Sequence, residues 1–537
     1  MPQTAGGGRH GVAGRGPADW PLLATIAAGT SVLAAAHLVR RPDLTFTADF
    51  LFHDHGNQLL IGRQLAAGAS LYADLAYPYG ALPAYLLALI AGVSLTAVTY
   101  VATLSALSVA FVLMIAHAVR RTTTRGVAAL VVVAGVMPFA VTPGGVAGAY
   151  TNNSYIGLER LALAGLVLLW RPPWDRSVGR SAGAGALAGA LQFVKFGSGV
   201  LATAAWLLVD LAASLRAGRP PVSRRRVLTA GTAFAGASLA VESVRWIALF
   251  ATYSADMAWD VAWPAYTAAF YQTIPARWPD GVTAAEFGTQ YLTPLAALAA
   301  TLAALAWWWR RPEGAPVAQA GLLLPSAFFV IGTAGYFGHI HTVRQYAWAL
   351  IPAAALWLAP PVPWRRVIAA GLAAPAVALM LRTALLSSPA PDMRPLRMGN
   401  GDVLWLHGRQ VDAVTRIGTS FERAVAGASP GSVLVVPIAG GLHFYFGGEP
   451  TTRHLWLLPH YIRPYDRPTL EARLPAVNEV FVVAGEEGGG SAGAHWTSAL
   501  QDAFGEPAAR DLQRRAVRVE TIAPRWWHIR LDAAPPD

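Results

Sequence analysis

The sequence predicts a mainly α-helical, polytopic membrane protein of about 11 transmembrane helices, followed by a small extracytoplasmic α/β domain. Two observations predict this class. Long apolar runs recur up to residue 386, and from residue 387 they give way to mixed polar sequence with short β-like stretches. A helix needs about 20 apolar residues to cross a bilayer, and several of the runs reach that length.

The composition supports a membrane protein. Of the 537 residues, 54% are hydrophobic and 13% are charged, whereas a soluble domain carries about 25% charged residues. The chain has no cysteine, which excludes disulfides, thiolate metal sites and cysteine nucleophiles. The net charge of +11 comes almost entirely from arginines in short loops between apolar runs. We interpret these arginines as orientation signals, and we expect no nucleic-acid partner.

The first 386 residues divide into a tail and a membrane domain. Residues 1–20 are Gly-rich and basic, so we expect a disordered cytoplasmic tail. A first span follows at 21–40, and no small-residue cleavage site follows it to indicate a signal peptide. The transmembrane domain is predicted to cover 21–386. Its apolar segments are 21–38, 81–95, 97–119, 127–141, 155–170, 182–211, 227–250, 291–309, 317–337, 346–358 and 367–386.

The basic loops between these segments constrain the topology. They are 120–125, 171–180, 216–226, 310–311 and 365–366, and the positive-inside rule places all of them in the cytoplasm. Counting 81–95 as a span puts the first of these loops outside. Counting 81–95 as a membrane-edge helix, and splitting 182–211 into two helices around Lys195, satisfies every loop. Both schemes give about 11 crossings and place 251–290 and 387–537 outside, and the sequence leaves the choice open.

The C-terminal residues 387–537 predict a separate α/β domain. The runs SVLVVPI at 432–438 and VFVVAG at 480–485 have the pattern of buried strands. Residues 421–426 and 499–504 have a helical pattern, so strands and helices alternate. No Walker-type phosphate loop occurs in the chain, and ATP-driven transport therefore has no support.

The first external loop, 41–80, holds the densest polar chemistry. An acidic residue lies between two histidines, a short amphipathic run follows, and a cluster of tyrosines with one aspartate ends the loop. These residues are His53, Asp54, His55, Tyr72, Asp74, Tyr77 and Tyr79.

The order of these features resembles the GT-C superfamily of membrane glycosyltransferases, which includes protein O-mannosyltransferases and the lipid A aminoarabinose transferase. In those enzymes an acidic residue in the first external loop heads a juxtamembrane helix, and a G-x-x-x-Y-x-D phrase and a Pro-led helix follow. Here Asp54 heads a helix expected at 56–67, GASLYAD supplies the phrase at 68–74, and YPYGALP leads into the next helix at 77–83. Where many members have an Asp-Glu pair, this chain has Asp54 and His55.

Two further segments are similar to the same family. They are GALQFVKFGSGVL at 189–201 and the stretch 431–461 of the C-terminal domain. The resemblance implies a GT-C-like fold and a sugar donor linked to polyprenyl phosphate.

The chemistry of such a donor indicates which residues to seek. Phosphate leaves as a stable anion, so the reaction needs a base for the acceptor hydroxyl and cations for the departing phosphate. We predict Asp54 as the base and Asp49 as the alternative. The competing interpretation of Asp54 is a helix N-cap. We expect no cofactor.

The remaining loop residues are predicted to bind substrate. His53 and His55 are expected to bind sugar or phosphate or to orient Asp54. A metal site is not favoured, because two histidines and an aspartate in consecutive positions do not easily converge on one ion. Asp74 is either a turn carboxylate or a ligand of sugar hydroxyls. Tyr72, Tyr77 and Tyr79 complete the predicted substrate-binding set.

Candidate cations lie in two further segments. Lys195 is the only lysine of the chain and interrupts an apolar run. It either snorkels to the headgroups or contacts phosphate. The segment GHIHTVRQY at 338–346 contains His339, His341 and Arg344, which either anchor the membrane interface or bind the donor phosphate.

Together these features predict an inverting glycosyltransferase of the cell membrane. It would transfer a sugar from a polyprenyl-phosphate donor to a glycan, lipid or protein acceptor on the extracytoplasmic face, with membrane lipids as its surroundings. Two other classes stay open: a transporter or flippase of a lipid-linked sugar, and a non-catalytic membrane scaffold.

Overall fold

The computed structural model describes residues 20–52, 54–121, 126–130, 154–195, 197–217, 224–263, 293–310, 317–333, 355, 358, 363–438, 440–457, 462–463, 465–483 and 495–532. Four predicted site residues, His53, His339, His341 and Arg344, lie outside these ranges. The same holds for residues 1–19 of the predicted tail and for 264–290 of the second external loop.

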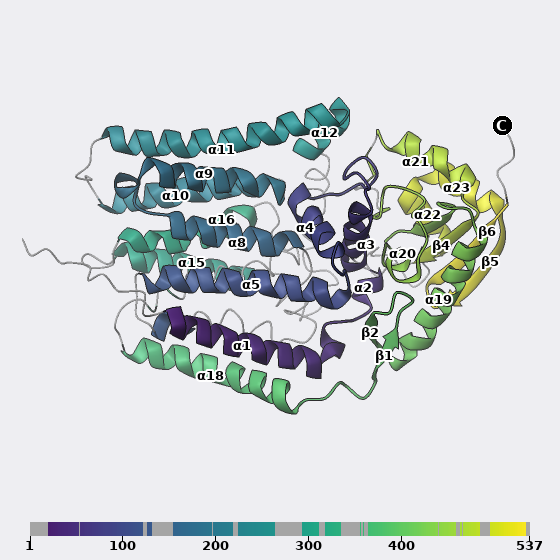
Figure 1. Cartoon of the computed structure of the whole chain (residues 1–537), viewed down its shortest axis with the longest axis horizontal. Helices are drawn as coiled ribbons and strands as arrows, with labels where there is room; N and C mark the ends of the chain where they lie inside the picture. The colour runs from purple at the N-terminus through teal and green to yellow at the C-terminus, as the bar shows by residue number, and fades with distance from the viewer. Residues whose placement is uncertain are drawn as a thin grey trace, which may run out of the picture.

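Long helices lie side by side in a bundle (Figure 1). They are α1 (Trp20–Arg40), α5 (Ala97–Arg120), α8 (Ser154–Leu169), α9 (Val178–Ala190), α10 (Ser198–Ala217), α11 (Arg224–Thr252), α15 (Thr293–Arg310), α16 (Leu324–Thr333) and α18 (Pro363–Leu386), with short 3-10 turns η3 (Pro173–Asp175), η4 (Leu191–Phe193) and η6 (Val317–Leu323). Within the described ranges, α1, α5, α10 and α11 are long and apolar enough to cross a membrane. The total of about 11 spans stays a prediction.

At the left end of the bundle in Figure 1, α5, α8 and α10 end and α9, α11 and α18 begin. There Arg176 pairs with Asp210 at 2.5 Å, and the Arg216 guanidinium lies 4.1 Å from the centroid of the Trp308 ring. Arg121 donates to the Leu168 carbonyl nearby. The described parts of the five basic loops lie at this end, and the side of the membrane that they face stays a prediction.

The other two features of the second topology scheme are also present. The segment predicted at 81–95 forms α4 (Ala81–Ala91), and eleven residues at 1.5 Å each reach about 16 Å, half the hydrocarbon thickness. The apolar run 182–211 breaks into α9 and α10, with η4 and Lys195 at the break. The break lies beside the start of α4, because the Gly80 amide donates to the Val194 carbonyl at 3.2 Å.

The first loop packs against the C-terminal part of the chain at this end. It contains η2 (Pro42–Leu44), α2 (Asp49–Phe52) and α3 (Asp54–Ala66), and α3 lies between α4 and α20 (Gly440–Phe446). A Cβ on Gly56 would lie 2.5 Å from the Cα of Gly441, so only glycine permits this approach. Asn57 accepts from the Gly440 amide at 2.7 Å and donates to the Leu455 carbonyl at 3.2 Å.

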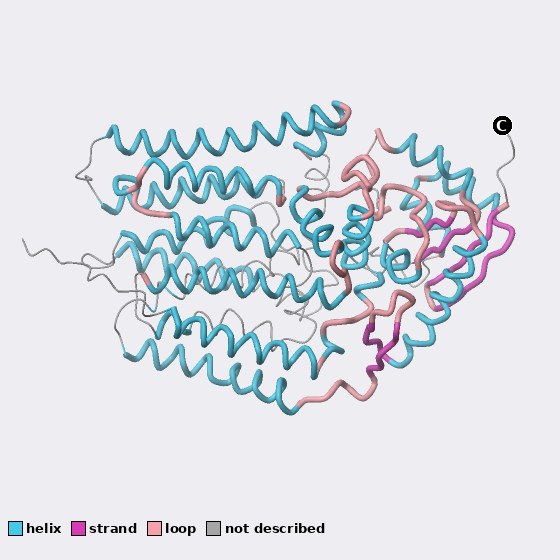
Figure 2. Tube along the Cα trace, viewed as in Figure 1, coloured by secondary structure: helices cyan, strands magenta, loops and turns pink. Residues whose placement is uncertain are grey.

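The strands occur at the C-terminal end (Figure 2). A hairpin is formed by β1 (Met393–Arg397) and β2 (Val403–His407), and a four-stranded sheet has the order β3 (Val433–Val436), β4 (Glu479–Val483), β6 (Trp526–Leu531), β5 (Ala516–Ala523). The helices here are α19 (Gly408–Gly427), α20, α21 (Arg467–Arg473), α22 (Trp496–Phe504) and α23 (Glu506–Arg515), with the turn η7 (Leu474–Ala476). The two strands predicted from the sequence are confirmed as β3 and β4, which pair in parallel.

The arrangement predicts which surfaces share a side of the membrane. A cysteine at Ala67 after α3, or at Asp412 on α19, should react with an impermeant maleimide from one side, and a cysteine at Val178 from the opposite side. All three positions are exposed, and the chain has no native cysteine to interfere. Labelling of intact cells and of inverted vesicles measures this. Reaction of Ala67→Cys and Val178→Cys from the same side would contradict the fold.

Candidate active site

Two adjoining cavities lie where the bundle meets the C-terminal part. The larger, of about 180 Å³, lies between α4 and the end of α11. The smaller, of about 40 Å³, lies between α12 (Ala255–Ala262) and residues 453–466. Both cavities are lined by Tyr72, Tyr77, Pro78, Asp260, Val261 and Arg463. A ligand in the larger cavity would therefore touch side chains that also face the smaller one.

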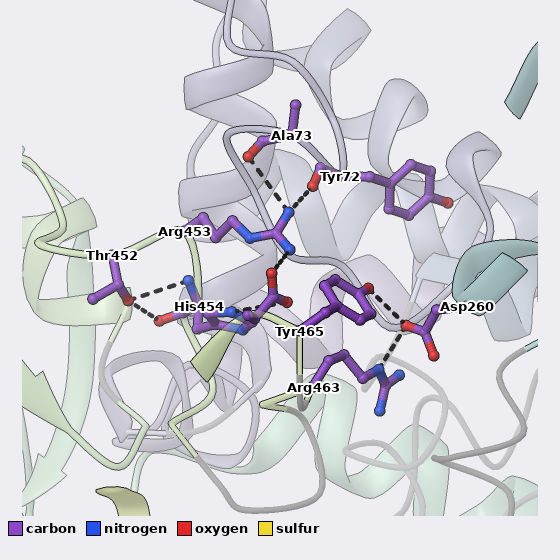
Figure 3. A network of polar contacts seen from close by, with 9 residues as sticks. Tyr72, Ala73, Asp260, Thr452, Arg453, His454, Arg463 and Tyr465 are labelled. Carbon is purple, nitrogen blue, oxygen red and sulfur yellow. Dashed lines mark hydrogen bonds and ion pairs between the residues drawn. The ribbon is translucent and has the colours of Figure 1, made fainter. Parts of the chain in front are cut away.

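Tyr72 adopts a backbone conformation that is costly for a bulky residue. Its φ is +67°, in the left-handed region. Several contacts hold it there: its hydroxyl donates to the Tyr79 carbonyl at 2.8 Å, its ring meets the edge of Tyr253, and the Arg453 guanidinium donates to its carbonyl oxygen (Figure 3). Burial raises the pKa of Tyr72, so the phenol stays protonated and remains a donor.

A row of aromatic rings runs from the cavities into the bundle. The ring centroids of Tyr77 and Tyr79 are 5.4 Å apart, and those of Tyr79 and Tyr155 are 4.5 Å apart. The Lys195 ammonium lies 4.8 Å from the centroid of the Tyr155 ring, within the range of a cation–π interaction. Tyr77 and Tyr79, predicted from the first loop, are thus connected through Tyr155 to Lys195, which was predicted from a different segment.

Asp54 contacts a wall residue of the smaller cavity. The indole N–H of Trp456 donates to Asp54 Oδ1 at 2.8 Å, and Trp456 lines that cavity. Asp54 is the first residue of α3. The Tyr100 hydroxyl, on α5, is buried near Asp54 and Tyr77 and has no hydrogen-bond partner among the described residues.

An ion pair joins α12 to the C-terminal part on the wall that the cavities share. Arg463 Nε donates to Asp260 Oδ2 at 2.6 Å, and the Tyr465 hydroxyl donates to the same oxygen at 3.3 Å (Figure 3). Burial, and then the charge of Asp260, raises the pKa of Tyr465, so this phenol also stays a donor.

A second network lies beside it. Arg453 donates to Asp466 Oδ1 as well as to the Tyr72 carbonyl, and His454 Nε2 lies 3.2 Å from Asp466 Oδ2 (Figure 3). Burial alone would raise the pKa of the Asp466 carboxyl. The close approach of His454, the hydrogen bond from Arg453 and the charge of Arg453 outweigh burial and hold this pKa below its usual value.

Arg245 supplies a further positive charge to the larger cavity. It lies near the end of α11 and is buried. Its Nη2 donates to Glu242 Oε1 at 2.5 Å and to the Ala262 carbonyl at 3.1 Å, and Trp246 donates to the same Glu242 oxygen at 2.7 Å. The wall of the larger cavity thus carries two arginines and one acid: Arg245, Arg463 and Asp260.

The sequence candidates fall into three groups. Tyr72, Tyr77 and Tyr79 line the larger cavity. Asp54 contacts Trp456 on the wall of the smaller cavity, and Lys195 contacts Tyr155, whose ring lies beside that of Tyr79. The third group lies away from both cavities, and its members are described next.

His55, Asp74 and Asp49 occupy separate positions. The His55 ring stacks on Phe50 at 4.6 Å and is buried in the apolar core. Asp74 is exposed and accepts from the Ser70 amide at 2.8 Å, which is the geometry of a turn carboxylate. Asp49 is exposed at the start of α2.

Several charged and polar residues of the site were not among the sequence candidates, in addition to Trp456 and His454. They are Arg245, Asp260, Arg453, Arg463, Tyr465 and Asp466. The pair Asp260 and Arg463 is separated by 203 residues, so no local pattern links the two. The available signal was the run of basic and aromatic residues at 453–467.

The described residues contain no group of three or more His, Cys, Asp or Glu side chains that could hold a metal ion. The expectation that no cofactor is used stays a prediction.

Comparison with known proteins identifies no family. No protein-family model matches the chain, and no curated protein matches it. Among solved structures, the chain is similar to the arabinofuranosyltransferase AftD from mycobacteria, at 14% identity and a TM-score of 0.43, with 86% of this chain covered. The chain spans 36% of the length of that enzyme. A TM-score below 0.5 does not establish a common fold, so function must be inferred from the site.

The Arg453–Asp466 network predicts an effect of pH on stability. Asp466→Asn should destabilise the protein at neutral pH by roughly 3 kcal/mol, because it removes a buried charge that pairs with the half-buried Arg453. The folded pKa of Asp466 lies below its ordinary value of 3.8. Its contribution is therefore complete above the unfolded pKa and is lost as the pH falls through the lower folded pKa. Thermal unfolding in detergent at several pH values measures both proteins.

The difference in unfolding free energy between the wild type and Asp466→Asn should become smaller below about pH 4. Glu471→Gln is a matched control on exposed α21 and should change stability by less than about 0.5 kcal/mol. If the difference in unfolding free energy stayed constant down to pH 3, the charge of Asp466 would contribute nothing to stability.

Proposed function

We propose that this protein is a membrane glycosyltransferase that moves a sugar from a polyprenyl-phosphate donor to an acceptor on the extracytoplasmic face, with inversion at the anomeric carbon. One observation carries the proposal. A cavity at one end of an apolar bundle has buried arginines on its wall and adjoins a second cavity whose wall residue, Trp456, binds the Asp54 carboxylate.

The walls of the larger cavity suit an amphiphilic donor. Tyr85 on α4 lines this cavity and is 53% exposed on the bundle surface, and Ile247 on α11 presents a further apolar side chain outward. The inner wall carries Arg245 and Arg463. A prenyl chain would lie against the apolar outer surface, and its phosphate would meet the arginines, which can bind phosphate oxygens in a bidentate manner.

Asp54 would act as the general base. It would accept the proton of the acceptor hydroxyl as that oxygen bonds to the anomeric carbon, and the bond to the donor phosphate would break with its electron pair leaving on the phosphate. The indole N–H of Trp456 restrains one carboxylate oxygen and leaves the other for the proton. Asp49 remains the alternative base.

Cations would stabilise the phosphate as it leaves. Arg245 and Arg463 lie on the cavity wall, and Lys195 lies behind the rings of Tyr79 and Tyr155. Arg344, which lies outside the described residues, stays a candidate for binding the donor phosphate. The acceptor is a glycan, lipid or protein hydroxyl, and a metal ion is not favoured.

The role of Asp54 predicts a large loss of activity in Asp54→Asn. The amide oxygen still accepts from Trp456, so the fold should persist, but it cannot take a proton. Transfer of a radiolabelled sugar from a prenyl-phosphate donor should fall by about a hundredfold or more. Thermal stability is measured alongside, and Asp412→Asn on exposed α19 serves as the control.

The same assay separates the alternatives. An inactive Asp49→Asn beside an active Asp54→Asn would move the base to Asp49. Transport of a lipid-linked sugar that persists in Asp54→Asn, with no transfer by the wild type, would identify a transporter instead.

The cations predict distinct defects. Lys195→Met should fold and should lower turnover by roughly a hundredfold if the lysine stabilises the leaving phosphate. Arg463→Lys should raise the KM for the donor, because a point charge cannot replace a planar guanidinium. The control is Arg416→Lys on the exposed face of α19. Steady-state kinetics with a prenyl-phosphate sugar measures turnover and KM for the three variants. Normal turnover in Lys195→Met would show that the lysine only anchors its segment.

A further inference from the structure

A carboxylate is buried inside the bundle and has no part in the chemistry described so far. Glu159, in the middle of α8, is 2% exposed. The Ser198 hydroxyl donates to its Oε1 at 2.5 Å, and its Oε2 has no hydrogen-bond partner among the described residues. A carboxylate in a membrane bundle is costly and is commonly functional, so Glu159 requires an explanation.

The serine that binds Glu159 begins the helix after the break at Lys195. At this break Gly197 has a φ of +78°, and its amide donates to the Gln192 side chain at 3.1 Å. The Ser198 amide donates to the Lys195 carbonyl at 3.1 Å. The chain between Gln192 and Ser198 therefore forms a tight turn that presents Lys195 to α8.

Two residues on one face of α8, Tyr155 and Glu159, contact this turn. Tyr155 and Glu159 are four residues apart and so lie on one side of the helix. Tyr155 accepts the Lys195 ammonium on its ring, and Glu159 accepts the Ser198 hydroxyl. Glu159 also lies within reach of electrostatic attraction from Lys195 and from its neighbour Arg160.

We propose that Glu159 is a positioning residue for Lys195. Together with Ser198, its carboxylate keeps the Lys195 amine charged and against the Tyr155 ring, at the inner end of the aromatic row that leads to the cavity. The consequence for catalysis rests on the proposed function, whereas the effect on the lysine does not. The competing role is structural: Glu159 would serve only as the counter-charge of Arg160.

The single lysine allows a direct test. Lys195 is the only lysine of the chain, so acetylation by acetic anhydride at one pH and quantification of the Lys195 peptide by mass spectrometry report on this amine alone. Only the neutral amine reacts, and removal of a neighbouring negative charge favours that form. Glu159→Gln should therefore acetylate at Lys195 at least threefold faster than the wild type, in purified full-length protein at pH 8.5.

Two further variants guard against a folding defect. Glu159→Asp keeps the charge and should acetylate within twofold of the wild type. Ser198→Ala keeps the carboxylate but removes its hydrogen bond, and should accelerate acetylation in the same direction as Glu159→Gln. Thermal unfolding is measured for each. Rates equal to wild type in both Glu159→Gln and Ser198→Ala would overturn the proposal and leave Glu159 as a partner of Arg160.

Sugar transfer by the same variants links the lysine to the reaction. Glu159→Gln should lower turnover more than it changes the KM for the donor, and Glu159→Asp should restore part of it. A wild type that transfers no sugar would refute the proposed function, yet a faster acetylation in Glu159→Gln would still establish the positioning role. An active wild type with unchanged acetylation in Glu159→Gln would refute the positioning role alone.

Discussion

The position of the candidate site depends on the contact between α3, in the first loop, and α20, in the C-terminal part. Glycines on both helices bring the backbones together, and Asn57 and Arg63 bond to backbone groups that would otherwise be buried without partners. Loss of either side chain would leave such groups unsatisfied, at about 1–3 kcal/mol each. Because Asp54 begins α3, this contact also brings its carboxylate to Trp456, 402 residues away.

Ion pairs form the polar parts of the walls of the two cavities beside this contact. A charge buried at the end of an apolar bundle is tolerated when a partner and hydrogen bonds compensate it. Asp260 with Arg463, Arg453 with Asp466, and Arg245 with Glu242 each meet this condition in the walls of the two cavities. These pairs hold α11, α12 and residues 453–466 together, and they keep guanidinium groups beside the cavities in a fixed orientation.

Backbone turns bring the remaining candidates to the same end. Tyr72 is held in the left-handed region by contacts from three other segments, and the chain turns back at Lys195 through Gly197. The two turns meet at the row of Tyr77, Tyr79 and Tyr155. Residues from the first loop and from the break between α9 and α10 thus form one aromatic path to the cavities.

The sequence by itself determined the features that depend on local composition. Apolar runs predicted the helices, arginine loops predicted one basic end, and the runs at 432–438 and 480–485 predicted β3 and β4. The tyrosines of the first loop, Asp54 and Lys195 were recognised because polar residues beside apolar segments are conspicuous. Only the tertiary structure decided that α4 is eleven residues long, and which arginine meets which acid. Those outcomes depend on contacts between residues as far apart as Asp260 and Arg463, and local pattern carries no information about such distant pairs.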